Sequence, residues 1–373
     1  MKNILYKVCR RYLDHAFDAL IGAEQPKIYY KEQGYLTHLL QSLPQLKQKY
    51  RPTPWLANTH LHILYFDFIK QKTIKLKYDL IERLVMHDGG ITAIAWFGLE
   101  LPEETPTIIL LHTLTGSPES MAEVVQDLNR YTGWRVALCI RRGHADLPMT
   151  VAKINLFGST DDLKEQIAYI QKKFPKSILY AAGSSAGTGL LVRYLGEVGA
   201  DTPVKAAFAL CPGYNTETGF TNIHPVYSRI MAKKLFEKFI SPYAEVWSDL
   251  NSLHQITAAK NLAEFERFYY EMAGFSDYQT YTQMTNPIYV FKNIKVPLLL
   301  LNAEDDPVCH IKNFEPYKQD IQKMNSIAVI TTRKGSHCGF YQGTLHTQSW
   351  AHQLMADFFK RYHHSVMSSS IRE

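Results

Sequence analysis

The stretch SILYAAGSSAGTGLLVRYLG, residues 177–196, provides the pattern from which the rest of the chain can be interpreted. An apolar run stops at the pentapeptide GSSAG (183–187), and residues with helical spacing begin directly after it. Strand, Gly-x-Ser-x-Gly and helix in this order are the context of a nucleophile elbow, where a serine lies on a sharp strand-to-helix turn. The two glycines leave room for that turn, because side chains there would clash. We therefore predict that Ser185 is a nucleophile.

A catalytic serine needs two partners, because the pentapeptide alone is a weak signal. A histidine must accept the proton of the hydroxyl, and a carboxylate must hold the histidine in the right tautomer. These partners are expected in the chain order serine, acid, histidine, each after a strand. The apolar run PLLLLNA is followed by Asp305 and Asp306, and SIAVITT is followed by His337. We predict His337 as the base and favour Asp306 over Asp305 as the acid, because Asp306 directly precedes a Pro-Val pair.

Attack by a serine creates an oxyanion, which needs preorganised N–H donors. The residue after the nucleophile, Ala186, is expected to supply one of them. The loop HTLTG (112–116) follows an apolar run and is expected to supply the other. We predict the N–H of Leu114 as this second donor, with Thr113 as the alternative.

The cysteines give no indication of a metal site. The chain has five of them, scattered and without a C-x-x-C pair, which favours a reducing compartment and no structural zinc. Cys309 and His310 lie beside the predicted acid, but no second pair of ligands stands at a suitable spacing. We predict no metal and no cofactor.

The apolar runs predict the fold. Runs without polar alternation are typical of strands that are covered on both faces, and helix-like stretches between them indicate a mainly parallel sheet with helices on both faces. A DGG turn at 88–90 between two further strand-like runs predicts a hairpin. The predicted buried strands are 107–112, 135–140, 177–182, 205–211, 297–303 and 326–332.

The 373 residues suit one large α/β domain with an insertion. Between 214 and 293 the strand rhythm stops and the sequence becomes helical and aromatic, which we interpret as a lid above the carboxyl ends of the strands. The predicted units are a helical lead-in (1–55), the first part of the core (56–213), the lid (214–293), the second part of the core (294–362) and a flexible tail (363–373).

Charge and hydropathy limit the partners. Lys and Arg number 41 and Asp and Glu 35, and the resulting net charge of +6 is spread along the chain, which argues against a nucleic-acid binder. Residues 2–21 have helical apolar spacing with basic residues on the other side. We favour a helix packed on the domain and keep peripheral contact with an anionic membrane as the alternative. Without a signal peptide pattern or ~18 consecutive apolar residues, we expect a cytoplasmic protein.

The joint occurrence of several motifs resembles the α/β-hydrolases of the AB hydrolase 4 group. That group includes membrane-associated monoacylglycerol and phospholipid lipases, bacterial YheT-like hydrolases and yeast ethyl-ester synthases. The resemblance implies a triad of Ser185, Asp306 and His337 on an α/β-hydrolase fold. The matching motifs are PTPWLANTHL (52–61), the DGG turn (88–90), LLHTLTGS (110–117), RRGH (141–144), FGSTDDL (157–163), GSSAG (183–187), NAEDDP (302–307) and GSHCGF (335–340).

One loop departs from the pattern of this group. Thr113 stands where the group usually has glycine, and Gly116 is followed by serine instead of a second glycine. The loop therefore also resembles that of homoserine acetyltransferases, so acyl transfer remains an alternative to hydrolysis. We expect a serine hydrolase acting on a small-molecule ester or lipid, such as a carboxylesterase or acylglycerol lipase. A binding protein on a hydrolase fold is a third hypothesis, and the sequence predicts no oligomeric state.

Overall fold

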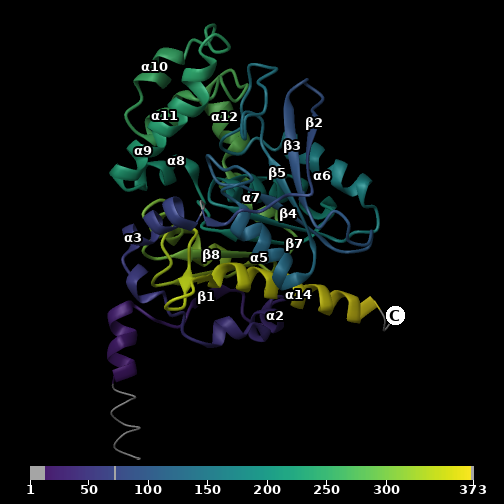
Figure 1. The fold of residues 1–373 in the computed structure, drawn as a ribbon, viewed down its shortest axis with the longest axis vertical. Helices are drawn as coiled ribbons and strands as arrows, with labels where there is room; N and C mark the ends of the chain where they lie inside the picture. Colours follow the sequence, from purple (N-terminus) through teal and green to yellow (C-terminus); the bar gives the residue numbers. More distant parts are fainter. Residues whose placement is uncertain (1–12, 71–72, 371–373) are drawn as a thin grey trace, which may run out of the picture.

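The computed structural model describes residues 13–70 and 73–370. In these residues nine strands form one sheet in the order β1-β9-β8-β7-β6-β4-β5-β3-β2 (Figure 1). A separate two-stranded sheet pairs β10 (Tyr341–Gln342) with β11 (Gln348–Ser349). The strands of the large sheet are β1 (Lys27–Tyr30), β2 (Leu80–Val85), β3 (Ile91–Phe97), β4 (Thr107–Leu111), β5 (Arg135–Ile140), β6 (Leu179–Ser184), β7 (Val204–Leu210), β8 (Leu298–Ala303) and β9 (Ile327–Thr332).

The six central strands, from β5 across to β9, are parallel to one another, and β3 and β2 extend the sheet as an antiparallel hairpin. All six apolar runs predicted as buried strands are confirmed, and so is the hairpin around the DGG turn. They were recognisable because β4, β5, β6, β8 and β9 are buried along their whole length. Because both faces of such strands are buried, their sequences show no alternation of apolar and polar residues.

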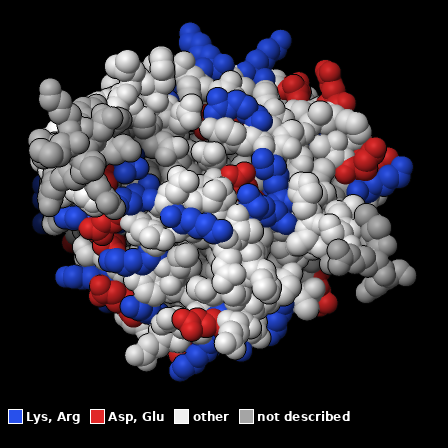
Figure 2. All heavy atoms as spheres, turned by 90° about the horizontal axis from the view of Figure 1, so that it is seen from below, with Lys and Arg blue, Asp and Glu red and all other residues white. Residues whose placement is uncertain are grey.

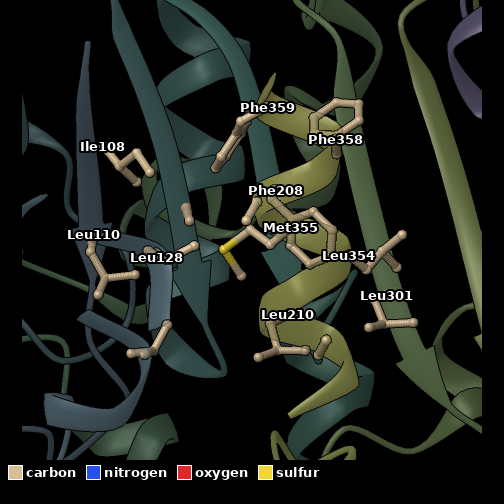
Figure 3. Close-up of a cluster of buried hydrophobic side chains, with 14 of the residues drawn as sticks. Ile108, Leu110, Leu128, Phe208, Leu210, Leu301, Leu354, Met355, Phe358 and Phe359 are labelled. Carbon is tan, nitrogen blue, oxygen red and sulfur yellow. The ribbon is translucent and has the colours of Figure 1, made fainter. Parts of the chain in front are cut away.

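Helices cover both faces of the sheet. In β4, Ile108 and Leu110 belong to one apolar cluster, and Ile109 and Leu111 belong to another on the opposite face. The first cluster includes side chains of α5 and α14. Figure 3 shows Leu128 of α5 near Leu110, and Leu354 and Met355 of α14 toward Phe208, Leu210 and Leu301 of the strands. The second includes side chains of α6 and α7. The helices are α2 (Thr37–Ser42), α3 (Thr59–Leu64), α5 (Ala122–Thr132), α6 (Asp161–Lys173), α7 (Ala186–Val198), α8 (Thr216–Gly219), α9 (Pro225–Leu235), α10 (Leu253–Ala258), α11 (Leu262–Phe268), α12 (Tyr278–Thr285), α13 (Lys318–Ile321) and α14 (Trp350–Ser370).

The chain between β7 and β8 contains α8 to α12, which lie together above one end of the sheet (Figure 1). A third apolar cluster holds this segment together, with Phe239, Trp247 and Phe265 fully buried in it. Leu114 and Phe157, which follow central strands, belong to the same cluster. The helical segment is therefore packed onto the loops at the carboxyl ends of the strands.

The two ends of the chain differ from the predictions. Residues 1–55 were predicted as a helical lead-in, yet β1 lies within them and pairs antiparallel with β9 at the sheet edge. A flexible tail was predicted from 363, yet α14 continues to Ser370. The polar composition of the tail was misleading, because His363 bonds the hydroxyl of Tyr180 and Val366 packs on the core. Most of the helix predicted over 2–21 lies outside the described residues; 13–21 are helical.

Two glycines of α7 provide a matched test of helix packing. A Cβ at Gly196 would overlap the carbonyl oxygen of Val290, whereas a Cβ at Gly189 would meet nothing within 4 Å. We expect Gly196→Ala to lower the free energy of unfolding by about 1–3 kcal/mol through overpacking. We expect Gly189→Ala to raise it by about 0.5–1 kcal/mol, because alanine is the better helix former. Denaturant unfolding measures both, and equal shifts would contradict the packing argument.

Candidate active site

Ser185 lies on the turn between β6 and α7 with a strained backbone, at φ 51° and ψ −119°. Its N–H donates to the carbonyl of Leu210 at 2.9 Å, which ties the turn to β7. A side chain at Gly187 would overlap the carbonyl oxygen of Leu111, and a Cβ at Gly183 would lie 2.6 Å from the carbonyl oxygen of Gly187. The two glycines therefore allow a turn on which a non-glycine residue keeps a positive φ, a strain typical of functional sites.

The side chains of Ser185, His337 and Asp306 form one hydrogen-bonded chain. Nε2 of His337 lies 2.8 Å from Oγ of Ser185, and its Nδ1 lies 2.8 Å from Oδ2 of Asp306. An ionised carboxylate can only accept, so Nδ1 carries the proton and Nε2 accepts from the serine hydroxyl. Burial disfavours the charged imidazole, but the adjacent Asp306 carboxylate outweighs burial and raises the pKa of His337 well above its usual value. The Asp306 carboxylate therefore stabilises the imidazolium that forms when His337 accepts the serine proton.

The two adjacent aspartates have different partners. Oδ1 of Asp306 accepts from the N–H groups of Val308 and Cys309 at 2.7 and 2.9 Å, which fixes the carboxylate while Oδ2 faces the imidazole. Asp305 instead accepts from the N–H of Ser336 at 2.9 Å. Burial raises the pKa of Asp305. The geometry brings Asp306, not Asp305, to His337, as the sequence analysis favoured.

The loop after β4 is fixed through its carbonyl groups. Arg141 donates to the carbonyl of Thr113 at 2.6 Å. Nε2 of His144 lies 2.9 Å from the carbonyl oxygen of Leu114, and Lys238 donates to that of Thr115 at 3.0 Å. A peptide group is planar, so holding the carbonyl of Thr113 also fixes the direction of the Leu114 N–H in the same peptide. The predicted donor Leu114 therefore lies on a fixed loop, and it lines the same cavity as Ala186, the first residue of α7.

The side chains that hold this loop are not among the site residues predicted from the sequence. Arg141 and His144 come from the RRGH motif directly after β5, whereas Lys238 lies on the π-helix η6 (Phe236–Ile240) of the helical segment. Burial and the nearby Arg141 lower the pKa of His144 to about 3, so this imidazole is neutral at pH 7. The available signal was the position of RRGH after a buried strand, at the same edge of the sheet as Ser185. No comparable signal pointed to Lys238.

Two cavities meet at Ser185. One, of about 90 Å³, is lined mainly by apolar side chains, among them Phe157 and Ile223. The other, of about 230 Å³, is lined by both apolar and polar groups, among them Asp67 and Lys234. A larger groove of about 910 Å³ lies between α2 and α14, and none of Ser185, Asp306 and His337 lines it. The chemistry of the site therefore concerns the two smaller cavities.

The sequence is similar to a known family and to several of its members. The model of the alpha/beta hydrolase fold matches residues 106–344. Phospholipase ABHD3 of Mus musculus is 26% identical over 86% of this chain and 80% of its own length. Embryogenesis-associated protein EMB8 of Picea glauca is 26% identical over 82% and 70%. Monoacylglycerol lipase ABHD2 of Danio rerio is 22% identical over 86% and 82%.

Solved structures resemble the fold as well. A hyperthermophilic esterase from Pyrobaculum calidifontis superimposes with a TM-score of 0.51 at 16% identity, covering 89% of this chain and 96% of the esterase. A 2,6-dihydroxy-pseudo-oxynicotine hydrolase reaches 0.51 at 12% identity over 76% and 67% of the two chains. At such identities the likeness concerns the fold alone. The predicted fold class is confirmed.

Proposed function

This chain belongs to the alpha/beta hydrolase fold family, and we propose that it hydrolyses carboxylic esters with Ser185, His337 and Asp306 as its catalytic triad. It is an ester hydrolase, as its relatives named phospholipase and monoacylglycerol lipase are. The observation that carries the triad assignment is the hydrogen-bonded chain from Oγ of Ser185 through His337 to Asp306. The three residues also follow one another in the chain order serine, acid, histidine, which is the order in this fold.

The proposed reaction forms and then hydrolyses an acyl-enzyme. Nε2 of His337 takes the hydroxyl proton of Ser185 as Oγ attacks the ester carbonyl carbon, and Asp306 stabilises the resulting imidazolium. The N–H groups of Leu114 and Ala186 stabilise the oxyanion. His337 then gives its proton to the departing alkoxide, which leaves as the alcohol. Water attacks the acyl-enzyme with His337 again as base, and the carboxylic acid is released.

The two cavities differ in polarity, so we expect them to hold different parts of the ester substrate. The apolar cavity suits the acyl chain, because Phe157, Ile223 and Leu262 line it beside Ser185. The larger cavity suits the alcohol part, because Asp67, Tyr227 and Lys234 add polar groups there. Residues from α9, η5 (Phe220–Asn222) and α11 line one cavity or both. We propose that residues 214–293 act as a lid and that the substrate class is lipid esters.

A panel of esters of increasing acyl length tests this function, combined with labelling by a fluorophosphonate probe. We expect hydrolysis with an optimum set by the apolar cavity, and covalent labelling located by peptide mass at Ser185. Including an alcohol acceptor separates hydrolysis from acyl transfer, because transfer would produce a new ester instead of free acid. A folded protein that neither hydrolyses any ester nor reacts with the probe would refute the proposal.

We also propose that the N-terminal helix contacts a lipid surface. In residues 13–21 the apolar Leu13, Phe17 and Leu20 are exposed at 71%, 47% and 81%. In the same residues the polar side chain that is buried is that of Asp18, which accepts hydrogen bonds from Lys49 and Arg51. The helix projects from the lower side of the molecule in Figure 1, and Figure 2 shows Lys and Arg spread over the face seen from below. Among the described residues, no helix has the length and apolarity needed to cross a bilayer.

Vesicle flotation tests this contact. We expect the chain to float with vesicles containing anionic phospholipid, and the triple substitution of Leu13, Phe17 and Leu20 by serine to weaken flotation, because the apolar area inserted into the interface is lost. Leu345→Ser is the matched control, because Leu345 is 88% exposed but lies outside the helix. Equal flotation of the triple variant and the unchanged chain would refute the contact.

A further inference from the structure

Three cysteines surround His337. One ligand atom from each of Cys211, His337 and Cys338 forms a group in which all atoms lie within 4.8 Å of one another. Asp306, Cys309 and His337 form a second such group on the same histidine. Cys139, by contrast, is buried within β5 and belongs to neither group. The proposed mechanism uses none of these thiols, so their presence around one imidazole calls for a separate explanation.

The fold creates this cluster from residues that are far apart in the sequence. Cys211, Cys309 and Cys338 lie in the loops after β7, β8 and β9, which are neighbours in the sheet. The N–H of Cys338 donates to Sγ of Cys211 at 3.2 Å, which fixes these two residues beside each other. The N–H of Cys309 bonds Asp306. The sequence around Cys309 shows no second pair of ligands, because the spacing along the chain does not reveal the pairing of Cys211 with Cys338.

We propose that Cys211, Cys338 and His337 form a binding site for one thiophilic divalent cation of the zinc or cadmium type. Thiolate and imidazole are the ligands that such ions prefer. Ligands bound at about 2.0–2.3 Å to a shared tetrahedral ion lie roughly 3.3–3.8 Å from one another. The ligand atoms of this group lie within 4.8 Å of one another, so small side-chain movements bring them to an ion. Both thiols bind as thiolates, so one ion enters and two protons leave, with no change in oxidation state. Cys309 lies beside the site and also lines the apolar cavity, which is the route of entry.

Binding of the ion abolishes hydrolysis. Both nitrogens of His337 are already engaged, Nε2 with Ser185 and Nδ1 with Asp306. A metal–nitrogen bond must replace one of these hydrogen bonds, so the histidine either loses the serine or loses its orienting carboxylate. The ion is therefore a reversible inhibitor and not a cofactor. This consequence rests on the proposed function, but the binding of the ion does not.

The test measures ion binding and activity separately. Titration of the metal-free chain with cadmium should produce the ultraviolet charge-transfer band of cadmium–thiolate bonds, saturating at one ion per chain. Zinc at saturation should abolish ester hydrolysis, and a chelator should restore it. In the double variant Cys211→Ala/Cys338→Ala the cadmium band should disappear. The zinc concentration that halves this double variant's own metal-free activity should be at least about tenfold higher than the concentration that halves the activity of the unchanged chain.

Cys139→Ala is the control, because its thiol lies away from His337; it should keep both the band and the inhibition. A cadmium band that survives in the double variant would overturn the site, and so would zinc inhibition of unchanged strength. Absence of any band in the unchanged chain would also overturn it. These failures are distinct from failure of the proposed function, in which the metal-free chain would hydrolyse no ester while the cadmium band remained.

Discussion

Replacing Ser185 by alanine is expected to lower kcat for ester hydrolysis by about 10⁶-fold, as loss of a triad nucleophile does in serine hydrolases. The variant lacks the atom that forms the acyl-enzyme, whereas His337 and Asp306 remain bonded to each other. Alanine has the same Cβ as serine and so meets the same backbone strain at φ 51°, and the glycines at 183 and 187 that make room for the turn are unchanged. Steady-state kinetics on a short-chain ester measures the loss, and thermal unfolding verifies that the variant is folded.

Ser184→Ala is the matched control for this prediction. Ser184 is the adjacent serine, buried as the last residue of β6 and aligned with Leu210 of β7. Its replacement removes a hydroxyl from the same turn without touching the bond between His337 and Ser185. We expect this variant to keep its activity and its reaction with a fluorophosphonate probe. If Ser184→Ala lost activity as completely as Ser185→Ala, the assignment of the nucleophile would be contradicted.

The local sequence pattern was sufficient to predict the three residues of the proposed triad. Ser185, Asp306 and His337 each follow a fully buried strand, and such strands reveal themselves as uninterrupted apolar runs. Parallel strands bring their carboxyl ends to one edge, so the order of the residues along the chain was enough to predict that they meet. The sequence favoured Asp306 over Asp305 but left both open, because neighbouring side chains in a loop can face opposite directions; the coordinates bring Asp306 to His337.

The features missed by sequence analysis depend on contacts between distant residues. Lys238 contacts the loop after β4 only because the helical segment packs over it, and no pattern within that segment marks this lysine. β1 was missed because four residues that complete a sheet edge against β9 carry little signal of their own. The pairing of Cys211 with Cys338 arises in the same way, from neighbouring strand ends. Each of these contacts depends on packing between segments that are far apart in the sequence.

Asp306→Asn is expected to lower kcat by about 10⁴-fold, the effect of this substitution in a serine triad. The asparagine oxygen can still accept from the N–H groups of Val308 and Cys309, so the loop keeps its shape. Its amide group then faces Nδ1 of His337 and donates to it. The imidazole is forced into the tautomer with its proton on Nε2, which cannot accept the proton of Ser185.

Asp305→Asn separates this effect from a general disturbance of the loop. An asparagine oxygen at 305 keeps the bond from the N–H of Ser336, and the substitution removes only a charge that lies 3.6 Å from Nζ of Lys334. We therefore expect Asp305→Asn to change kcat far less than Asp306→Asn on the same ester. Thermal unfolding verifies that both variants are folded. If the order of the two effects were reversed, Asp305 would be the triad acid and the hydrogen bond from His337 to Asp306 would not be the catalytic one.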